Sequence, residues 1–330
     1  MSRYADSHKK PNGPGDARPT AMQIVEDEGR LGIMKDKVVL MTGASSGIGI
    51  ETARAMAATD AKVFLAVRSI EKAQQTCASF LKPGRVELLE CDTSSLSSAR
   101  DAAATFLAKS PVLNILICNA GIMMVPQREE SVDGFETQLA TNYLGHFLLF
   151  WLLRDAMIKG STPDFNSRLV HVSSSGHHRS DIQFDDFNLE QNGAYDPSKA
   201  YGQSKLAQIY MANYVNRVYG PRGIHALSVM PGGILTNLQR HLSDSAKASW
   251  TENEQLMRWM KSPEQGAATT VLAAVGHEWE GRGGKYLEDC GVASSLPLIP
   301  GVRGVSDYAY DQCKEDKLFE MTLDLLKLNT

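Results

Sequence analysis

The sequence carries little net charge of either sign. Its 330 residues include 34 Lys and Arg against 38 Asp and Glu, which gives a formal net charge of −4 at pH 7. Proteins that bind nucleic acid or anionic lipid usually present a pronounced basic patch. This balanced composition supplies no excess of cations for such a patch, so we expect no nucleic-acid partner.

Long apolar runs are also missing. A transmembrane helix needs about 20 consecutive, mostly apolar residues, and the sequence contains no such run, so no membrane span is predicted. Residues 1–20 are polar and rich in glycine, proline and charge, unlike a signal peptide or an anchor. We therefore expect residues 1–30 to form a polar, partly disordered arm, and the protein to be cytoplasmic.

The sequence has few cysteines, and they are not closely spaced in pairs. The five cysteines are odd in number and widely separated: Cys77, Cys91, Cys118, Cys290 and Cys313. A disulfide framework or a zinc site would need cysteines at paired, closely spaced positions. The pattern favours reduced thiols, and we expect no metal site.

What the chain does contain is a regular alternation of two kinds of segment. Short apolar runs, expected to be strands, lie at 37–41, 62–67, 86–91, 113–118, 168–172, 224–230 and 285–290. Helix-length segments lie at 49–59, 70–80, 95–109, 131–159, 197–219 and 263–275. This order predicts an α/β fold: a doubly wound parallel sheet (Rossmann fold) of about seven strands, in a single domain over residues 31–330.

Two long segments interrupt the alternation, at about 175–196 and 233–262. Both follow expected strands, and ligands bind at the carboxyl ends of strands in open sheets. The second segment contains five large apolar residues: Trp250, Leu256, Met257, Trp259 and Met260. They indicate a loop that contacts a lipophilic substrate, such as a polyketide, terpenoid or steroid-like ketone. The alternative is that these side chains belong to the core.

A glycine-rich turn joins the first expected strand to the first helix. Gly43 would permit the tight turn, Gly47 the close approach of a pyrophosphate, and Gly49 the packing of the helix on the strand. Ser45, Ser46 and Ile48 complete the turn. A glycine triplet alone is weak evidence, but its place between a strand and a helix predicts a dinucleotide site.

The end of the second strand bears on which dinucleotide is bound. An acid there would hold the ribose 2′-hydroxyl of NAD, whereas a cation accommodates the 2′-phosphate of NADP. Arg68 occupies this place and favours NADP(H); the alternative is an ordinary surface arginine. Asp92 and Thr93 follow the third strand, where adenine would lie. Residues Asn119, Ala120 and Gly121 follow the fourth and could line the cofactor or form a turn.

Tyr201 and Lys205 form the candidate site of proton transfer. A phenol has a pKa near 10, and a nearby ammonium would lower it. Positions i and i+4 lie on the same side of a helix. Tyr195 and Lys199 have the same spacing, but Pro197 suits the first helical turn and leaves Tyr195 outside the helix. Tyr201 is therefore the better acid.

Two further polar residues lie at the same expected edge of the sheet. Ser174, within a run of three serines after the fifth strand, could hydrogen-bond a substrate oxygen as charge develops. Asn142 is polar within a strongly apolar helix. The alternative is that Asn142 is a buried amide that hydrogen-bonds backbone groups. The spacing of the residues does not decide between this structural role and a functional one.

These motifs together resemble the short-chain dehydrogenase/reductase family over about residues 35–290. The family's glycine-rich turn matches residues 42–49, its Asn-Ala-Gly residues 119–121, its Tyr-xxx-Lys residues 201–205 and its Pro-Gly residues 231–232. The chain looks most like the branch of retinol dehydrogenases and the WW-domain oxidoreductase, including fungal members. It departs from that branch in lacking a membrane anchor and a WW domain, and in having Cys118 where an asparagine is usual.

The resemblance implies a role for each matching residue. Tyr201 would be the general acid/base, Lys205 would lower its pKa and bind the nicotinamide ribose, and Ser174 would position the carbonyl. Asn142 would hold a water that connects Lys205 to solvent. Pro231, Gly232, Ile234 and Thr236 would contact the cofactor, the last near the carboxamide.

The expected activity is therefore NADPH-dependent reduction of a ketone or aldehyde on a lipophilic small molecule, or the reverse oxidation. A rival from another class is a non-catalytic NADP(H)-binding regulatory or scaffold protein of the same fold. A rival among enzymes is an epimerase or dehydratase, whose usual glycine spacing and larger C-terminal region are not seen here. Homodimers in the family commonly pair the helices at 131–159 and 197–219, and the sequence leaves this state open.

Overall fold

The fold is built on one eight-stranded sheet, seen in a computed structural model that describes residues 2–295 and 303–328. The strands are β1 (Val38–Thr42), β2 (Lys62–Val67), β3 (Val86–Glu90), β4 (Ile115–Cys118), β5 (Ser167–Val172), β6 (Ile224–Met230), β7 (Lys285–Glu288) and β8 (Gly291–Val292). Their spatial order is β3-β2-β1-β4-β5-β6-β7-β8, and the pairs from β3 to β7 are all parallel. The predicted doubly wound sheet is confirmed.

The sheet has one strand more than predicted. β8 contains two residues and pairs antiparallel with β7, with Val292 opposite Leu287. A strand this short leaves no periodic signal in the sequence, and it lies just beyond the expected strand at 285–290. The sheet gains an antiparallel edge and the fold class is unchanged.

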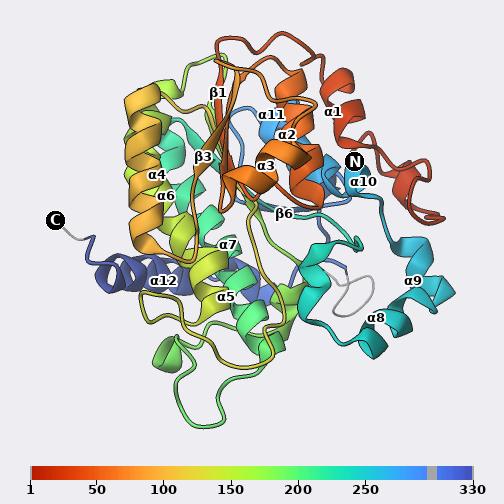
Figure 1. The fold of residues 1–330 in the computed structure, drawn as a ribbon, viewed down its shortest axis with the longest axis vertical. Coiled ribbons are helices and arrows are strands. Elements are labelled where there is room, and N and C mark those ends of the chain that lie inside the picture. The colour runs from red at the N-terminus through yellow and green to blue at the C-terminus, as the bar shows by residue number, and fades with distance from the viewer. Residues whose placement is uncertain (1, 296–302, 329–330) are drawn as a thin grey trace.

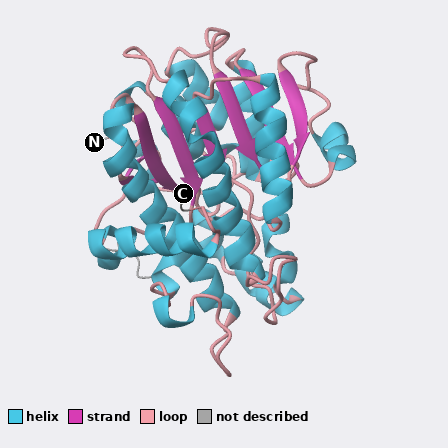
Figure 2. Ribbon diagram, turned by 90° about the vertical axis from the view of Figure 1, so that its left-hand side faces the viewer, coloured by secondary structure: helices cyan, strands magenta, loops and turns pink. Residues whose placement is uncertain are grey.

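Helices cover both faces of the sheet, as Figure 2 shows. One face carries α4 (Leu96–Lys109), α6 (Gly145–Gly160), α7 (Pro197–Tyr219) and α12 (Gln312–Leu325). The other carries α1 (Ala21–Asp27), α2 (Ile48–Ala58), α3 (Ile70–Thr76) and α11 (Ala268–Val275). Alternate residues of β1 enter the two cores, Leu40 one and Met41 the other, so every position of β1 is buried. Among the residues that the structure describes, no helix has the length and apolar character to cross a membrane.

Two predicted helices are divided in the structure. The segment at 131–159 begins instead at α5 (Thr137–Leu139), because the Glu136 carboxylate accepts the amides of Gln138 and Leu139 and so starts the helix there. A π-helical turn, Ala140–Leu144, then leads into α6. The segment at 263–275 contains α10 (Pro263–Gly266) followed by α11.

The N-terminal residues pack against the body of the protein. Ile24 and Val25 of α1 are fully buried in the same core as α11. Arg18 is 3% exposed and donates hydrogen bonds to the backbone carbonyls of Trp259 and Met260, 2.9 and 2.6 Å away. Residues 2–30 thus contain a short apolar stripe that packs against α11 and a buried cation, Arg18, that ties them to the end of the 233–262 segment.

The 233–262 segment forms two short helices, α8 (Asp244–Thr251) and α9 (Glu254–Trp259). Figure 1 shows them projecting from one side of the molecule. Trp250, Leu256, Met257 and Trp259 are half-buried, whereas Met260 is buried. The apolar residues of this segment are therefore mostly peripheral.

Helix α12 lies across α6 and α7 (Figure 1, dark blue). The Phe319 ring stacks on Tyr214 with 3.8 Å between centroids and contacts Phe147 of α6 at 4.8 Å. The Asn213 amide donates to the Glu315 carboxylate at 2.8 Å. Helix α12 thus covers the outer surface of α6 and α7.

Candidate active site

A cleft opens where the strand order reverses. β1 and β4 are neighbours, and the chain runs outward from them in opposite directions, which makes their carboxyl ends the expected ligand site of an open parallel sheet. Most predicted site residues line this cleft: Gly43, Ser45, Ser46, Gly47, Ile48, Arg68, Asp92, Thr93, Asn119, Ala120, Gly121, Ser174, Tyr201, Lys205, Pro231, Ile234 and Thr236. Gly49, Asn142 and Gly232 are not among its lining residues.

The glycine-rich turn has a geometry suited to a phosphate. Gly43 and Gly47 have φ of 72° and 55°, a region that favours glycine. A Cβ on Gly49 would overlap the Gly43 carbonyl, so the start of α2 can lie against the turn only without a side chain. Gly47 is the N-cap of α2 and makes no side-chain cap bond. The Gly49 and Ile50 amides donate to the carbonyls of Ser46 and Gly47 at 3.2 and 3.3 Å, and the positive end of the α2 dipole lies at this turn, where it favours an anionic ligand.

Hydrogen bonds tie the turn to the end of β4. The Thr42 hydroxyl oxygen accepts the backbone amides of Asn119 and Ala120, each at 3.0 Å. The Asn119 side-chain amide donates back to the carbonyls of Thr42 and Gly43 at 3.0 and 3.1 Å. Its Oδ1 atom is buried and has no partner within the described part of the chain, so it is free to accept from a bound cofactor.

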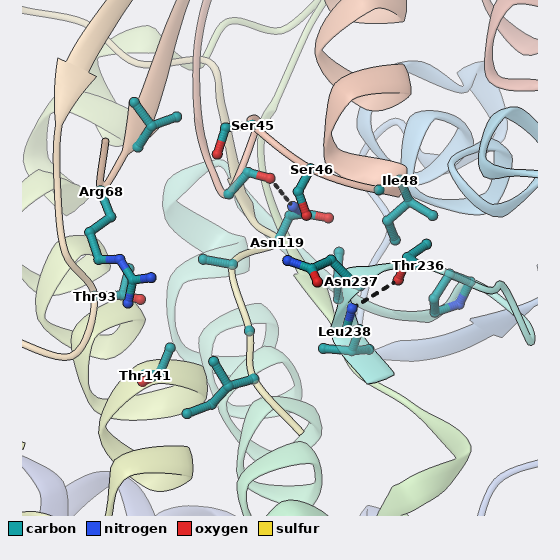
Figure 3. Close-up of a pocket in the computed structure, with 18 of the residues that line it drawn as sticks. Ser45, Ser46, Ile48, Arg68, Thr93, Asn119, Thr141, Thr236, Asn237 and Leu238 are labelled. Atoms are coloured by element: carbon teal, nitrogen blue, oxygen red, sulfur yellow. Dashed lines mark hydrogen bonds between the residues drawn. The ribbon is translucent and has the colours of Figure 1, made fainter. Parts of the chain in front are cut away.

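Three cations gather at one end of the cleft. Arg68 directly follows β2, Lys72 lies in the first turn of α3, and Arg240 comes from the 233–262 segment. None of the three forms an ion pair with a carboxylate in residues 2–295 or 303–328. Burial and the charge of Arg68 lower the pKa of Arg240. Figure 3 shows Arg68 on one side of the cleft and Thr236, Asn237 and Leu238 on the other.

The residues of the cleft fit a dinucleotide. The positive end of α2, the unpartnered Asn119 oxygen and the cations without carboxylate partners each offer an interaction that an anionic, hydrogen-bonding ligand would satisfy. Part of the hydrogen-bonding capacity of Asp92 is already used within the protein, because its Oδ1 accepts hydrogen bonds from the amide and hydroxyl of Ser94 at 2.9 and 2.7 Å. The cleft is thus electrically positive where a phosphate would lie.

Tyr201 and Lys205 lie at the other end of the cleft, on α7. Helix α7 begins at Pro197, as predicted, and Asp196 caps it by accepting the Lys199 amide at 2.8 Å. Tyr195 remains outside this helix and donates its hydroxyl to the Val125 carbonyl at 2.7 Å. Of the two tyrosine–lysine pairs, only Tyr201 and Lys205 line the cleft.

The electrostatics of this pair differ in part from the expectation. Burial raises the pKa of Tyr201, and a hydrogen bond with Ser174 and the charge of Arg179 oppose that rise. Lys205 Nζ lies 5.6 Å from the centre of the Tyr201 ring and donates to the Val172 carbonyl at 2.9 Å. Burial lowers the pKa of Lys205 to about 7. Burial is therefore the main influence on the pKa of both side chains.

Asn142 lies behind the cleft in the π-helical turn and is fully buried. Its side chain accepts the Ile122 amide at 2.9 Å and donates to the Ile122 carbonyl at 3.0 Å and the Ser204 hydroxyl at 2.9 Å. These bonds join the segment after β4 to α7. They match the alternative that the sequence left open, a buried amide that satisfies backbone groups.

The cleft also includes residues that the sequence did not single out. They are Ala66, Val67, Lys72, Cys91, Ile122, Thr141, Val172, Ser173, Asn237, Leu238 and Arg240. Lys72 lies one helical turn beyond Arg68, a spacing that could have revealed it. Arg240 comes from a segment with no strand or helix pattern, so its approach to Arg68 had no sequence signal.

Comparison with known proteins agrees with this geometry. A family model described as enoyl-(acyl carrier protein) reductase matches residues 43–279. The chain is 52% identical over 328 residues to a short-chain dehydrogenase/reductase, prx1, of Penicillium roqueforti, which covers 99% of this chain and 96% of the relative. It is 37% identical over 295 residues to the polyprenol dehydrogenase of Homo sapiens, covering 87% of each chain.

Solved structures share the fold. A Pseudomonas aeruginosa RhlG/NADP active-site complex has a TM-score of 0.62 at 22% identity and covers 78% of this chain and 96% of that chain. The fold, the cleft and the matches to relatives define a nicotinamide-dependent oxidoreductase. The chain belongs to the short-chain dehydrogenase/reductase family.

Gly176 gives a test of how tightly the Tyr201 ring is held. A Cβ at Gly176 would lie 2.6 Å from Tyr201 Cε1, closer than packed atoms allow, so Gly176→Ala must displace the ring. We expect kcat to fall at least about tenfold while cofactor affinity stays within about twofold. Steady-state kinetics and fluorescence titration with NADPH measure the two quantities. Gly220→Ala is the matched control, because its added Cβ meets only ordinary contacts at 3.5 Å or more. Equal losses in both variants would contradict this prediction.

The buried ammonium of Lys205 predicts a pH-dependent cost in stability. The pKa falls from 10.5 to about 7 on folding, so the unfolded chain binds the extra proton between these values. Stability is therefore lost as pH falls from about 10.5 to about 7. We expect Lys205→Met to be more stable than the wild type at pH 6, by about 1–4 kcal/mol, and the gain to shrink toward pH 10. Urea unfolding across this range measures it, with Lys199→Met as the control. A Met variant that is less stable at pH 6 would refute the prediction.

Proposed function

We propose that this protein reduces a ketone or aldehyde of a lipophilic small molecule with NADPH, or catalyses the reverse oxidation. The observation that carries the proposal is the meeting of Tyr201 and Ser174 with the glycine-rich turn in a single cleft. When bound, the nicotinamide supplies the hydride that reduces the carbonyl carbon. All remaining steps fall to residues of the chain.

In the proposed reaction Tyr201 donates its proton to the oxygen that becomes the alcohol. The raised pKa of Tyr201 keeps the phenol protonated at neutral pH and makes it available as a donor. Ser174 donates a hydrogen bond to the same oxygen and so stabilises the developing negative charge. Lys205, whose pKa near 7 lets it exchange a proton near neutrality, is proposed to support Tyr201 and to bind the nicotinamide ribose.

The preference for NADP(H) is supported by the cation cluster of Arg68, Lys72 and Arg240. Three positive charges without carboxylate partners are costly close together, and a 2′-phosphate would relieve their repulsion. NAD has only a hydroxyl at this place and would leave the repulsion intact. Pro231, Gly232, Ile234 and Thr236 are proposed to contact the nicotinamide half.

A lipophilic substrate is supported by the apolar residues of the 233–262 segment and by a relative described as a polyprenol dehydrogenase. The half-buried tryptophans of α8 and α9, Trp250 and Trp259, keep part of their surface available to an apolar ligand. A screen of NADPH oxidation against a library of carbonyl compounds would identify the substrate class.

Tyr201→Phe tests the proton donor. We expect kcat to fall by about 10²-fold or more, because a general acid contributes about 10²–10⁴-fold, with NADPH affinity changed less than about threefold. Stopped-flow oxidation of NADPH and equilibrium titration supply the two readings. Tyr195→Phe has the same chemistry outside the cleft and should keep its activity. Loss of activity in the Tyr195 variant alone would reverse the assignment.

NADPH binding by the wild type with no turnover of any carbonyl would instead favour a regulatory or scaffold protein.

Arg68→Ala and Arg240→Ala test the cofactor preference. Each removes a charge-assisted contact to the 2′-phosphate, so the ratio of kcat/KM for NADPH over NADH should fall about tenfold or more in either variant. Arg100→Ala removes an exposed arginine that does not line the cleft and should leave the ratio unchanged. An unchanged ratio in both Arg68→Ala and Arg240→Ala would remove the support for NADP(H).

A further inference from the structure

The carbonyl of Asn142 is the acceptor of two protein hydrogen bonds. The Gln208 side-chain amide, Nε2, donates to it at 2.8 Å, and His146 Nδ1 lies 2.9 Å from it. A carbonyl oxygen has two lone pairs, so both are in use. The Asn142 side-chain amide likewise donates both of its hydrogens, to the Ile122 carbonyl and to the Ser204 hydroxyl. The resemblance assigns a water on Asn142, but a water at this carbonyl would have to displace a side chain.

Gln208 reaches Lys205 with its other end. Its Oε1 accepts from Lys205 Nζ at 3.1 Å, and the two residues are three positions apart on α7. Gln208 is fully buried. Its carbonyl oxygen accepts a hydrogen bond from Lys205, and its amide donates one to the backbone carbonyl of Asn142. A single side chain therefore spans the gap between the ammonium and the π-helical turn.

The tautomer of His146 follows from its neighbours. The Thr42 hydroxyl oxygen accepts two backbone amides, so its hydrogen goes to His146 Nε2, 2.8 Å away. Nδ1 then carries the ring hydrogen and donates to the Asn142 carbonyl. Burial lowers the pKa of His146 to about 4, so the ring is neutral and holds this arrangement across the physiological range.

Among the residues that the structure describes, no carboxylate is bonded to Lys205 or shifts its pKa. The titratable neighbours are Tyr201 on α7, His146 on α6 and His171 on β5. Burial lowers the pKa of His171 well below its ordinary value, so both imidazoles are neutral. The Lys205 ammonium is held by two neutral acceptors, the Val172 carbonyl and Gln208 Oε1. Each of these acceptors should therefore have a large influence on the charged form.

We propose that Gln208 is a positioning residue that takes the place of a relay water: it bridges the Lys205 ammonium to the Asn142 carbonyl and fixes the ammonium beside Tyr201. This inference rests on the proposed function, because it gives Gln208 its role in that reaction. It follows that the interior side of Lys205 is closed by protein and that Lys205 exchanges its proton with solvent from the cleft side. Gln208 does not line the cleft and acts only through Lys205.

Two substitutions should move the titration of Lys205 in opposite directions. Gln208→Leu removes an acceptor from the ammonium, which should weaken proton binding by about tenfold and lower the pKa of Lys205 by about one unit. Gln208→Glu keeps an acceptor and adds a negative charge, which should raise the same pKa by about one unit or more. A purely structural role would impair both variants without opposite shifts.

The direct measurement is an NMR titration of lysine side chains in the cofactor-free protein, with the Lys205 resonance assigned from Lys205→Met. The second reading is the alkaline limb of the pH profile of kcat, which should move in the same direction as the titration in each variant. Gln203→Leu is the matched control: Gln203 is equally buried on α7 but bonds to Gln183 and Phe187 instead. It should leave the titration of Lys205 within about 0.3 units.

Each outcome decides something. Opposite shifts support the bridge, whereas shifts in one direction, or none, overturn it. If Gln208→Leu does not fold, Gln208→Asn carries the test, because a side chain one methylene shorter cannot reach both Lys205 and Asn142 and should lower the pKa of Lys205. If wild-type protein turns over no carbonyl while the opposite shifts occur, the proposed function fails and the bridge stands. Turnover that depends on Tyr201 without any shift gives the reverse result.

Discussion

The contact of the Thr42 hydroxyl with the backbone of Asn119 and Ala120 is the constraint on which the site depends. It joins the ends of β1 and β4 at the point where the sheet reverses its order. Without this tie the two loops could move apart, and the first turn of α2 would no longer face the segment after β4. The same hydroxyl is hydrogen-bonded to His146 of α6. One small side chain therefore connects the glycine-rich turn to the buried polar residues behind the cleft.

From Thr42 a continuous hydrogen-bonded path runs to Lys205. It passes through His146 and the Asn142 carbonyl to Gln208, with successive separations of 2.8, 2.9, 2.8 and 3.1 Å. All its members are neutral except its last, and all are buried. Buried polar groups that are satisfied in this way specify one arrangement, because an unmatched partner would be costly. The glycine-rich turn and the Tyr201–Lys205 pair are thereby held in a fixed relation.

The sequence predicted the sheet, the order of its helices and most of the cleft, because those features depend on local signals. Apolar runs located the buried strands, and Pro197 with Asp196 located the start of α7 and separated Tyr201 from Tyr195. The features that the sequence could not predict depend on contacts between segments that are distant along the chain. Arg240 approaches Arg68 only because the 233–262 segment folds back over the cleft. Likewise, Arg18 has local polar neighbours but finds its partners at Trp259 and Met260.

Helix α12 has a consequence for how the protein is made. Its Phe319 covers Phe147 and Tyr214, yet α12 comes long after α6 and α7 along the chain. During synthesis the sheet and the helix that carries Tyr201 can assemble while that apolar surface is still bare. Intermediates with exposed apolar surface are prone to aggregate. The protein therefore passes through a period in which its active-site helix is formed but unprotected, and chaperones would have their greatest effect in that interval.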